Sequence, residues 1–442
     1  MSDDAGAPSR SAGRDATDPG EGVSPGRPRS VGVHTVGLGT VFVVLAGTLV
    51  IGHAIKTPCV HGDWSDGRPF TRLCSNDIVQ LLEHEQLTGG RLPYLQPCGG
   101  EGGPCDEYPP LMMWTMRLTA SASGPSQTQF FYWNAILLWL AAFWIAYVLY
   151  QLVGSRALYF AAAPTLAIYA TFNWDLLAVL LAVAGTYAYL TRRDAWAGGL
   201  LGLGAATKLF PALLILPFVA GRYREGESDR GVLLASSSVA AWLAANLPFA
   251  LLAFSGWWEF FRFNGERPAS FDSVWFVGCE WASDIGCTDT RLVNFASGAL
   301  FIFGVAVAWW TKRRREPSFP RWSLGFPIVA LFLITTKVYS PQYSLWLLPW
   351  FALALPHLGL FLAFEIADMA VFVSEFSWFG TLNHIDGGLA GIVPLGAFEV
   401  AIVLRTLVLL ACVVAWVRQR ATRPLPVAAS AAPVVAPGGS YV

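Results

Sequence analysis

Charged residues are scarce in this chain. They make up 13% of its 442 residues, about half of the roughly 25% that is usual in soluble globular domains, whereas 54% of the residues are hydrophobic. An excess of positive charge is also lacking, since the formal net charge is -1, and no basic face is available for a nucleic acid partner. The composition therefore excludes an ordinary soluble protein and predicts a polytopic membrane protein.

The two ends of the chain lack the long apolar stretches of its middle. Residues 1–30 consist largely of Ser, Gly, Pro, Asp and Arg. Because they have little apolar surface to offset the entropy of ordering, we expect a disordered cytoplasmic segment that does not resemble a signal peptide. Residues 421–442 are Ala, Pro, Val and Gly without periodicity, which indicates a disordered cytoplasmic tail. Residues 31–420 form the predicted membrane domain.

Apolar segments follow one another through this domain, and they predict an all-α polytopic bundle of about 12 transmembrane segments. Several are short or interrupted by proline, so those at 195–221 and 344–374 are candidates for half-helices that turn inside the protein. The predicted segments are 32–54, 128–152, 156–171, 174–190, 195–207, 210–221, 231–254, 292–311, 322–336, 344–355, 358–374 and 393–416.

Positive charge recurs at alternate ends of these segments, as the positive-inside rule requires of a chain whose amino end is cytoplasmic. With this orientation the long loops 55–127 and 255–291 are extracytoplasmic. We therefore expect a multi-pass plasma membrane protein with its functional face outside. The clusters placed inside are Arg192 and Arg193, Arg222 with Arg224 and Arg230, Lys312 to Arg315, and Arg418 with Arg420.

Cysteine usage agrees with this orientation. Six of the seven cysteines lie in the two loops that are predicted to be outside, and Cys412 lies in a membrane segment. An oxidising exterior favours disulfides, although unpaired thiols are the alternative. Four cysteines in the first loop allow three pairings, of which sequence proximity favours the two local ones. The candidates are Cys59 with Cys74, Cys98 with Cys105, and Cys279 with Cys287.

The first outer loop is longer than a connector needs to be, and it contains a helical pattern. Ser75 or Asn76 can cap a helix whose first turn contains Asp77. The carboxylate of Asp77 then has two interpretations, a charge favoured by the helix dipole or a catalytic base. The apolar stripe of this helix comprises Ile78, Leu81 and Leu82.

Two turns at the outer side present further polar residues. Tyr108 precedes Pro109 and Pro110, which forbid a helix and fix the direction of the chain. The second turn, Asn173-Trp174-Asp175, joins two apolar segments. Because an Asp at a bilayer centre costs about 2.5–3.5 kcal/mol, Asp175 is expected at the interface or in a polar cavity. An ordinary helix cap and an ion pair with Lys208 are the alternatives.

Lysine occurs at only four positions, and two of them, Lys208 and Lys337, stand at the outer ends of apolar segments. Both run against the positive-inside bias. A compact ammonium group at the outer surface suits a phosphate ligand, whereas snorkelling to lipid headgroups is the alternative interpretation.

The second outer loop combines aromatic and charged residues, namely Trp257, Trp258, Arg262, Arg267, Asp272 and Trp275. Aromatic rings beside charges can stack on sugars, but interfacial aromatic belts have the same composition.

In their order along the chain, these pieces resemble glycosyltransferase family 87. Its members are polytopic actinobacterial enzymes of the GT-C class that use polyprenyl-phosphate mannose as donor. The resemblance covers about residues 55–350. The matching pieces are Asp77 in the first long outer loop, Tyr108 to Leu111, Asn173 to Asp175, the glycine-rich run from Gly198 to Pro211, and Tyr339 to Tyr343.

The resemblance implies a GT-C-like bundle that transfers mannose from a polyprenyl-phosphate donor to a hydroxyl of a lipid or glycan acceptor outside the membrane. One base that acts in a direct displacement inverts the anomeric centre, and Asp77 fits that base, with Lys208 and Lys337 on the phosphate. No His and Cys cluster has metal-ligand spacing, so we expect neither metal nor cofactor. The candidates for the sugar and acceptor pocket are Tyr108, Asn173, Trp174, Asp175, Arg262, Asp272, Gln342 and Tyr343.

A transporter or lipid flippase is the alternative from another class. Glu365 and Asp368 lie three residues apart on one face of an apolar segment, and Glu399 and Arg405 lie in another, as an ion path requires. The concentration of the other polar residues on one side argues against alternating access, which uses a site at the midplane. Among transferases, arabinofuranose or another sugar from the same kind of lipid stays open.

Overall fold

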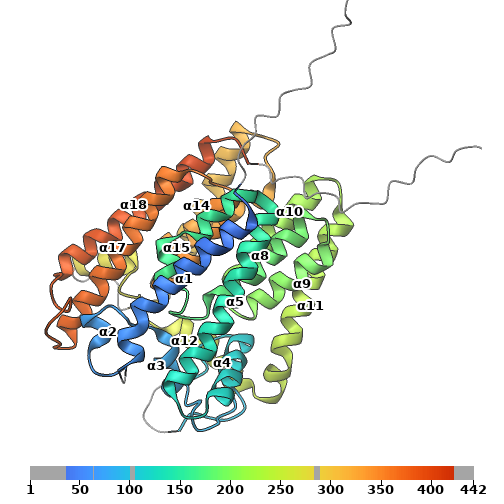
Figure 1. Cartoon of the computed structure of the whole chain (residues 1–442). Coiled ribbons are helices and arrows are strands. Elements are labelled where there is room, and N and C mark those ends of the chain that lie inside the picture. Colours follow the sequence, from blue (N-terminus) through green and yellow to red (C-terminus); the bar gives the residue numbers. More distant parts are fainter. Residues whose placement is uncertain (1–35, 63, 100–104, 283–288, 423–442) are drawn as a thin grey trace, which may run out of the picture. The chain divides into compact units, whose positions relative to one another are not determined.

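The computed structural model describes residues 36–62, 64–99, 105–282 and 289–422, and every regular element within these ranges is a helix (Figure 1). The predicted all-α class is thereby confirmed. The segment 1–30 and nearly all of the predicted tail lie outside the described residues. The described residues belong to one compact unit.

The chain forms helices wherever its apolar segments run, because a helix satisfies all backbone hydrogen bonds within one segment. The α-helices are α1 (Leu38–Val60), α2 (Arg68–Thr71), α3 (Asp77–His84), α4 (Pro110–Ser123), α5 (Gln127–Val153), α6 (Leu158–Ala161), α7 (Pro164–Tyr169), α8 (Asp175–Leu190), α9 (Asp194–Ala205), α10 (Ile215–Arg224), α11 (Ser228–Leu252), α12 (Phe254–Glu266), α13 (Val274–Ala282), α14 (Thr290–Arg315), α15 (Gly325–Thr335), α16 (Leu348–Leu353), α17 (Leu358–Leu382) and α18 (Leu395–Arg418). The short 3₁₀ helices are η1 (Gly154–Ala157), η2 (Phe210–Leu214), η3 (Arg321–Leu324) and η4 (Pro341–Trp346).

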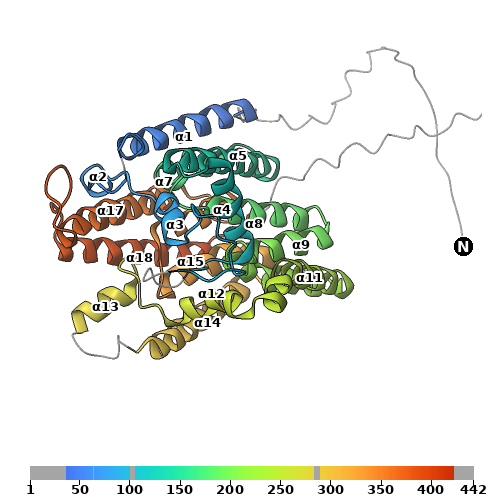
Figure 2. The ribbon, with the colours of Figure 1, turned by 90° about the horizontal axis from the view of Figure 1, so that it is seen from below.

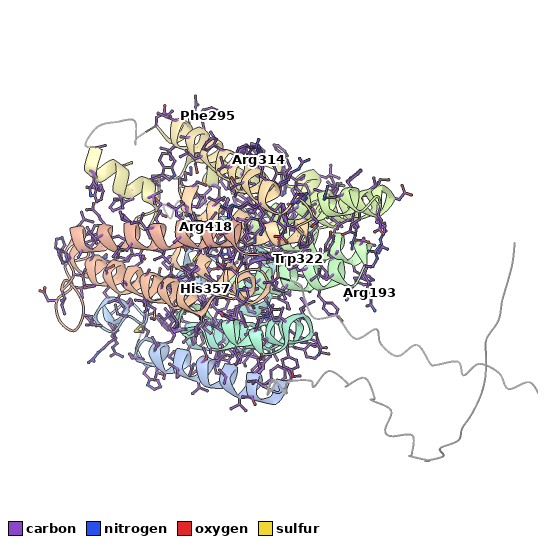
Figure 3. The ribbon with its side chains drawn as sticks, turned by 90° about the horizontal axis from the view of Figure 1, so that it is seen from above. Arg193, Phe295, Arg314, Trp322, His357 and Arg418 are labelled. Carbon is purple, nitrogen blue, oxygen red and sulfur yellow. A yellow bond between two sulfur atoms is a disulfide. The ribbon has the colours of Figure 1, made fainter. Side chains whose placement is uncertain are left out.

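Within the described ranges, five helical stretches are long and apolar enough to cross a membrane: Leu38–Val60, Gln127–Ala161, Ser228–Leu252, Thr290–Arg315 and Leu395–Arg418. Many of their exposed side chains are apolar. Phe295 on α14, which Figure 3 labels, is 76% exposed, as expected of a side chain that faces lipid. Membrane embedding is supported, whereas the count of about twelve spans stays a prediction, because the other apolar helices are shorter or carry acidic residues.

The helices pack in a continuous series. Helix α9 contacts α8 and α11, α5 contacts α1 and α8, α1 contacts α7, and α17 and α18 pack together beside α15 (Figure 2). The glycine-rich run of α9 lies against α11 at close range. A Cβ atom built on Gly202 would be 2.2 Å from the Ser238 carbonyl oxygen of α11. Glycine in this run therefore allows the two backbones to approach.

This close approach predicts a stability effect. Gly202→Ala is expected to destabilise the protein by about 1–3 kcal/mol, because the added methyl group overpacks the interface between α9 and α11. Gly199→Ala is the matched control, since a Cβ on Gly199 meets nothing within 4 Å. Thermal unfolding in detergent measures both variants, and equal midpoints would show that the interface tolerates the methyl group.

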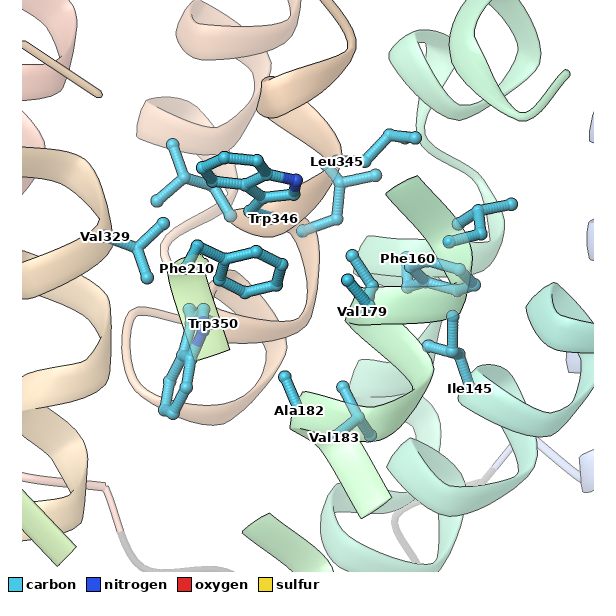
Figure 4. Packing of buried hydrophobic residues seen from close by; sticks show 14 of the residues in the cluster. Ile145, Phe160, Val179, Ala182, Val183, Phe210, Val329, Leu345, Trp346 and Trp350 are labelled. Atoms are coloured by element: carbon cyan, nitrogen blue, oxygen red, sulfur yellow. The ribbon is translucent and has the colours of Figure 1, made fainter. Parts of the chain in front are cut away.

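Proline interrupts the short segments, and polar side chains lie at the breaks. Helix α9 ends at Ala205, and Pro211 in η2 lacks the N–H that a continuing helix would use. Lys208 lies in this break. Pro341 likewise begins η4, which supplies Gln342 and Tyr343. The two breaks meet where Phe210 stacks on Trp346, with ring centroids 4.3 Å apart (Figure 4).

The outer loops contain more helix than the sequence predicts. In loop 55–127, α2, α3 and α4 lie toward the lower end of α1 and α5 in Figure 1. In loop 255–291, α12 and α13 are also helical. Disulfides join Cys59 to Cys74 and Cys98 to Cys105, the two pairs that sequence proximity favours. Cys287 lies outside the described residues, so its predicted bond with Cys279 cannot be followed.

The basic junctions that the positive-inside rule places together contact one another. Hydrogen bonds or ion pairs link the turn after α8 to the turn after α10, the end of α10 to the loop after α14, and α14 to the end of α18. Their assignment to the cytoplasmic side stays a prediction. The contacts are Arg192 with Glu227, Arg224 Nη2 to Pro317 O at 3.0 Å, and Lys312 Nζ to Gln419 O at 2.5 Å.

Candidate active site

A cavity of about 640 Å³ lies where the first outer loop meets the two proline breaks. Its walls come from α3, the Tyr108 turn, the break after α9, α12, α14, the end of α15 and η4. Six of the predicted site residues line it: Asp77, Tyr108, Lys208, Lys337, Gln342 and Tyr343. Segments as far apart as Asp77 and Gln342, which are 265 positions from each other, thus supply one site.

Local hydrogen bonds fix the start of α3 and with it Asp77. The Asn76 side chain accepts a hydrogen bond from Val79 N at 3.0 Å, as expected of an N-cap residue. The backbone N–H of Asp77 donates to the Phe172 carbonyl at 2.9 Å. This second bond connects α3 to the turn that carries Asn173. The catalytic candidate is therefore held from both sides.

A lysine that sequence reasoning did not select supports this arrangement. Lys56 is fully buried at the end of α1, and its Nζ donates to the Ser75 carbonyl at 2.5 Å. Its ammonium group also lies over the Phe172 ring, 5.1 Å from the centroid. Lys56 thus anchors the residues directly before Asp77. Its position at the end of an apolar segment looks like ordinary snorkelling, so the sequence offers little signal for this contact.

The carboxylate of Asp77 is asymmetrically bonded. Its Oδ2 accepts hydrogen bonds from Asn173 Nδ2 at 2.9 Å and from Gln342 Nε2 at 3.2 Å. Hydrogen bonds among the described residues leave Oδ1 without a donor. Burial raises the Asp77 pKa to about 6, against the opposing effects of the Asn173 hydrogen bond and the Lys208 charge. A carboxylate with one unbonded oxygen in a cavity can accept a proton from a hydroxyl group.

Asn173 connects this carboxylate to the Tyr108 turn. Its Nδ2 also donates to the Tyr108 hydroxyl at 2.9 Å, and its Oδ1 accepts from Trp174 N at 2.7 Å. Trp174 itself is completely buried and donates to Asn134 Oδ1 at 2.6 Å. Asn173 and Trp174 therefore lie behind the residues that line the cavity and help to hold them in place. Neither belongs to the residues that line the cavity within the described ranges.

Lys208 is held by a buried carboxylate. Its Nζ lies 2.7 Å from Asp175 Oδ2, and the other Asp175 oxygen accepts from Trp346 Nε1 at 2.7 Å. The ammonium group lies 5.2 Å from the Tyr108 ring centroid and 5.3 Å from that of Tyr343. Since an ammonium group has three donors, bonding to Asp175 leaves capacity for an anion in the cavity. Of the interpretations of Asp175, this geometry matches the ion pair that orients Lys208.

Lys337 reaches the cavity from the loop after α15. Its Nζ donates to the carbonyls of Gly265 at 3.0 Å and Arg267 at 2.7 Å, at the end of α12. Burial, with a contribution from the Arg267 charge, lowers the Lys337 pKa to about 8. Arg267 lines the cavity as well, although sequence reasoning did not place it in the site. Three cations, Lys208, Lys337 and Arg267, therefore face one cavity.

Two further candidates lie elsewhere. Arg262 is exposed on α12 and pairs with Glu259, 2.7 Å away. Asp272 is buried, where Ser270 Oγ donates to its Oδ1 at 2.8 Å and its backbone carbonyl accepts from Arg405 at 2.5 Å. In the described part of the chain neither residue lines the cavity.

The segment before Tyr108 is ordered by a buried ion pair that sequence reasoning missed. Arg91 lies 2.9 Å from Asp106 Oδ1 and 3.2 Å from Glu85 Oε2. The Tyr94 hydroxyl donates to the Tyr108 carbonyl at 2.5 Å. These contacts fix the backbone that presents Tyr108. They join residues up to 15 positions apart, beyond what local patterns indicate.

The acidic residues that favoured a transporter have partners inside the bundle. Glu365 accepts hydrogen bonds from the Thr165 N–H at 2.8 Å and hydroxyl at 3.1 Å at the start of α7. Asp368 lies 3.2 Å from Arg405 Nη1. Glu399 accepts from Trp281 Nε1 at 3.0 Å. Each contact joins one helix to another, as a structural role requires.

Among the described residues no group of three or more His, Cys, Asp or Glu side chains is placed to hold a metal ion. The expectation that the site needs neither metal nor cofactor stays a prediction, to be tested with a chelator.

The raised pKa of Asp77 predicts a pH dependence. A base acts as the carboxylate, so kcat/KM is expected to fall about tenfold per pH unit below about 6 and to level off above it. At high pH, kcat/KM is expected to decline from about pH 8 upward, because Lys337 loses its proton there. Initial rates across pH 4–10 measure both limbs, with pH-jump controls for irreversible unfolding. An acid limb near 4 would contradict the role of a buried base.

Residues 107–341 match the model of glycosyltransferase family 87. The matched range contains most of the cavity lining, including Tyr108, Lys208 and Lys337, whereas Asp77 precedes it and Gln342 and Tyr343 follow it. A search of curated proteins gave no match.

Proposed function

The chain belongs to glycosyltransferase family 87, and on this premise we propose that it transfers mannose from a polyprenyl-phosphate donor to a hydroxyl group of a lipid or glycan acceptor. In this proposal Asp77 is the general base, and Lys208 and Lys337 bind the donor phosphate. The reaction takes place on the outer face of the plasma membrane.

The proposal rests on one observation, namely that a carboxylate and several cations line the same cavity. Asp77, with one oxygen free of donors among the described residues, lines the same cavity as Lys208, Lys337 and Arg267. Sugar transfer from a lipid phosphate needs a base at the attacking hydroxyl and positive charge at the departing phosphate. The cavity offers both.

In the proposed reaction the acceptor oxygen attacks the anomeric carbon of the donor sugar. A bond forms between these two atoms as the bond from the anomeric carbon to the phosphate oxygen breaks. The acceptor proton passes to Asp77, and the electron pair leaves with polyprenyl phosphate, beside Lys208 and Lys337. Displacement on the opposite face inverts the anomeric centre, so a β-linked donor gives an α-linked product. Cationic side chains replace a metal at the leaving phosphate.

The donor lipid is proposed to reach the cavity from the membrane. Asn294 and Ser297 on α14 and Phe332 on α15 belong to the lining, and α14 is the least buried of the candidate spans. An apolar chain can therefore lie beside α14 while its phosphate is bound at Lys208.

The test uses the purified full-length protein in nanodiscs with radiolabelled polyprenyl-phosphate mannose and a lipid and glycan extract, in parallel with the corresponding arabinofuranose donor. Label is expected to move from the mannose donor into an α-linked product, and EDTA is expected to leave the rate unchanged. Transfer only from the arabinofuranose donor would correct the sugar. Activity lost to EDTA and restored by a divalent ion would refute metal independence. A folded protein that neither transfers nor hydrolyses any such donor would overturn the proposal.

A further inference from the structure

Helix α3 forms one wall of the cavity along its entire length. Asp77, Gln80, Leu81 and His84 line the cavity, at positions i, i+3, i+4 and i+7 of one helical face. With a rise of 1.5 Å per residue, the face extends roughly 10 Å from Asp77 to His84. This is longer than one pyranose ring. The wall therefore continues beyond the place where an attacking hydroxyl would lie.

The far end of this wall has a different chemistry from the region around Lys208. His84 Nε2 and Glu107 Oε1 are 2.8 Å apart, and both residues line the cavity together with Asn264. A carboxylate accepts several hydrogen bonds, so the one to His84 leaves Glu107 capacity for a ligand hydroxyl. Gln80 adds an amide on the same face. Carboxylates, amides and imidazoles bind neutral polyols, whereas the cationic region suits phosphate.

The backbone beneath Glu107 is fixed. Its N–H donates to Glu85 Oε1 at 3.2 Å, and Glu85 pairs with the buried Arg91. From α12, Asn264 Nδ2 approaches the Glu107 carbonyl at 3.5 Å. A side chain on such a support loses little freedom when it binds a ligand, which favours recognition.

We propose that Gln80, His84, Glu107 and Asn264 form an acceptor subsite for a second sugar ring. The acceptor is then a glycan of at least two sugar units, whose terminal unit presents a hydroxyl to Asp77 and whose preceding unit is bound by the His84–Glu107 pair. This inference deepens the proposed function and rests on it. It excludes a simple lipid alcohol as the preferred acceptor.

The test compares two acceptor probes that share the same octyl chain, octyl α-mannoside and octyl α-mannobioside. Radiolabelled polyprenyl-phosphate mannose is the donor. Wild type is expected to prefer the mannobioside by about tenfold or more in kcat/KM, because hydrogen bonds to charged groups contribute strongly. Glu107→Gln and His84→Ala are expected to reduce this ratio to near one, chiefly by raising KM for the mannobioside. Glu83→Gln, an exposed position of α3 outside the cavity lining, is the matched control.

The outcomes separate the subsite from the function itself. No preference in wild type, a preference that both variants retain, or an equal loss of kcat for both probes would overturn the subsite. Donor hydrolysis with no transfer to either glycoside would also overturn it, while the proposed donor reaction would survive. If wild type neither transfers nor hydrolyses the donor, the proposed function itself fails.

Discussion

Asp77→Asn is expected to lower the rate of sugar transfer by about 10²–10⁴-fold, because general base catalysis contributes a factor of that order. The amide keeps the shape of the side chain but cannot accept the proton. Initial rates with the radiolabelled donor measure the loss, and Glu83→Gln is the control for removing a carboxylate from the same helix. A variant that retained more than a tenth of the wild-type rate would contradict the role of Asp77 as the base.

The alternative role of Asp77, a favourable charge at the start of α3, makes a different prediction. A dipole interaction of this kind contributes about 0.3–1 kcal/mol, so its loss would move the unfolding midpoint slightly and leave catalysis nearly intact. Thermal unfolding of Asp77→Asn measures that contribution separately. We expect a small change in stability and a large change in rate.

Lys208→Met is expected to lower kcat/KM for the donor by about 10²–10³-fold, the usual effect of removing a group that stabilises developing negative charge. The substitution also leaves Asp175 buried without its cation, which costs about 3–5 kcal/mol of stability. Activity alone therefore cannot distinguish a phosphate ligand from half of a structural ion pair.

The double variant Lys208→Met with Asp175→Asn separates the two roles. Removing both charges is expected to restore much of the lost stability but not the activity, because the substituted amide oxygen can keep accepting from Trp346 Nε1. Unfolding midpoints and donor kinetics are measured on the same preparations. If activity returned together with stability, Lys208 would have a purely structural role. Asp175→Asn alone is expected to be unstable with its donor affinity little changed.

Local patterns predicted the parts of the site that depend on neighbours in sequence. Asn76, one of the two predicted cap residues, caps α3, and Asp77 lies in the first turn of that helix as predicted. The twelve apolar segments all contain helices, although α1 begins at Leu38 and extends to Val60, six residues later than predicted at either end. Helix boundaries depend on capping and tertiary contacts, which composition does not specify.

Contacts between distant segments could not be predicted in the same way. The ion pair of Lys208 with Asp175 was one of several alternatives, and only the packing of α8 against the break after α9 brings the two groups together. The bonds from Lys337 to Gly265 and Arg267 depend on helix α12, which the sequence did not predict. His84 and Glu107 are ordinary polar residues of a long loop until the fold places them beside Asp77.

The most direct test of the central claim is an experimental structure of the protein in nanodiscs with a polyprenyl-phosphate sugar analogue that resists transfer. We predict that the phosphate lies within hydrogen-bonding distance of Lys208 Nζ, and that Asp77 faces the side of the anomeric carbon opposite the phosphate. A donor phosphate bound away from Lys208, with the cavity beside Asp77 empty of sugar, would contradict the assignment of this cavity as the active site.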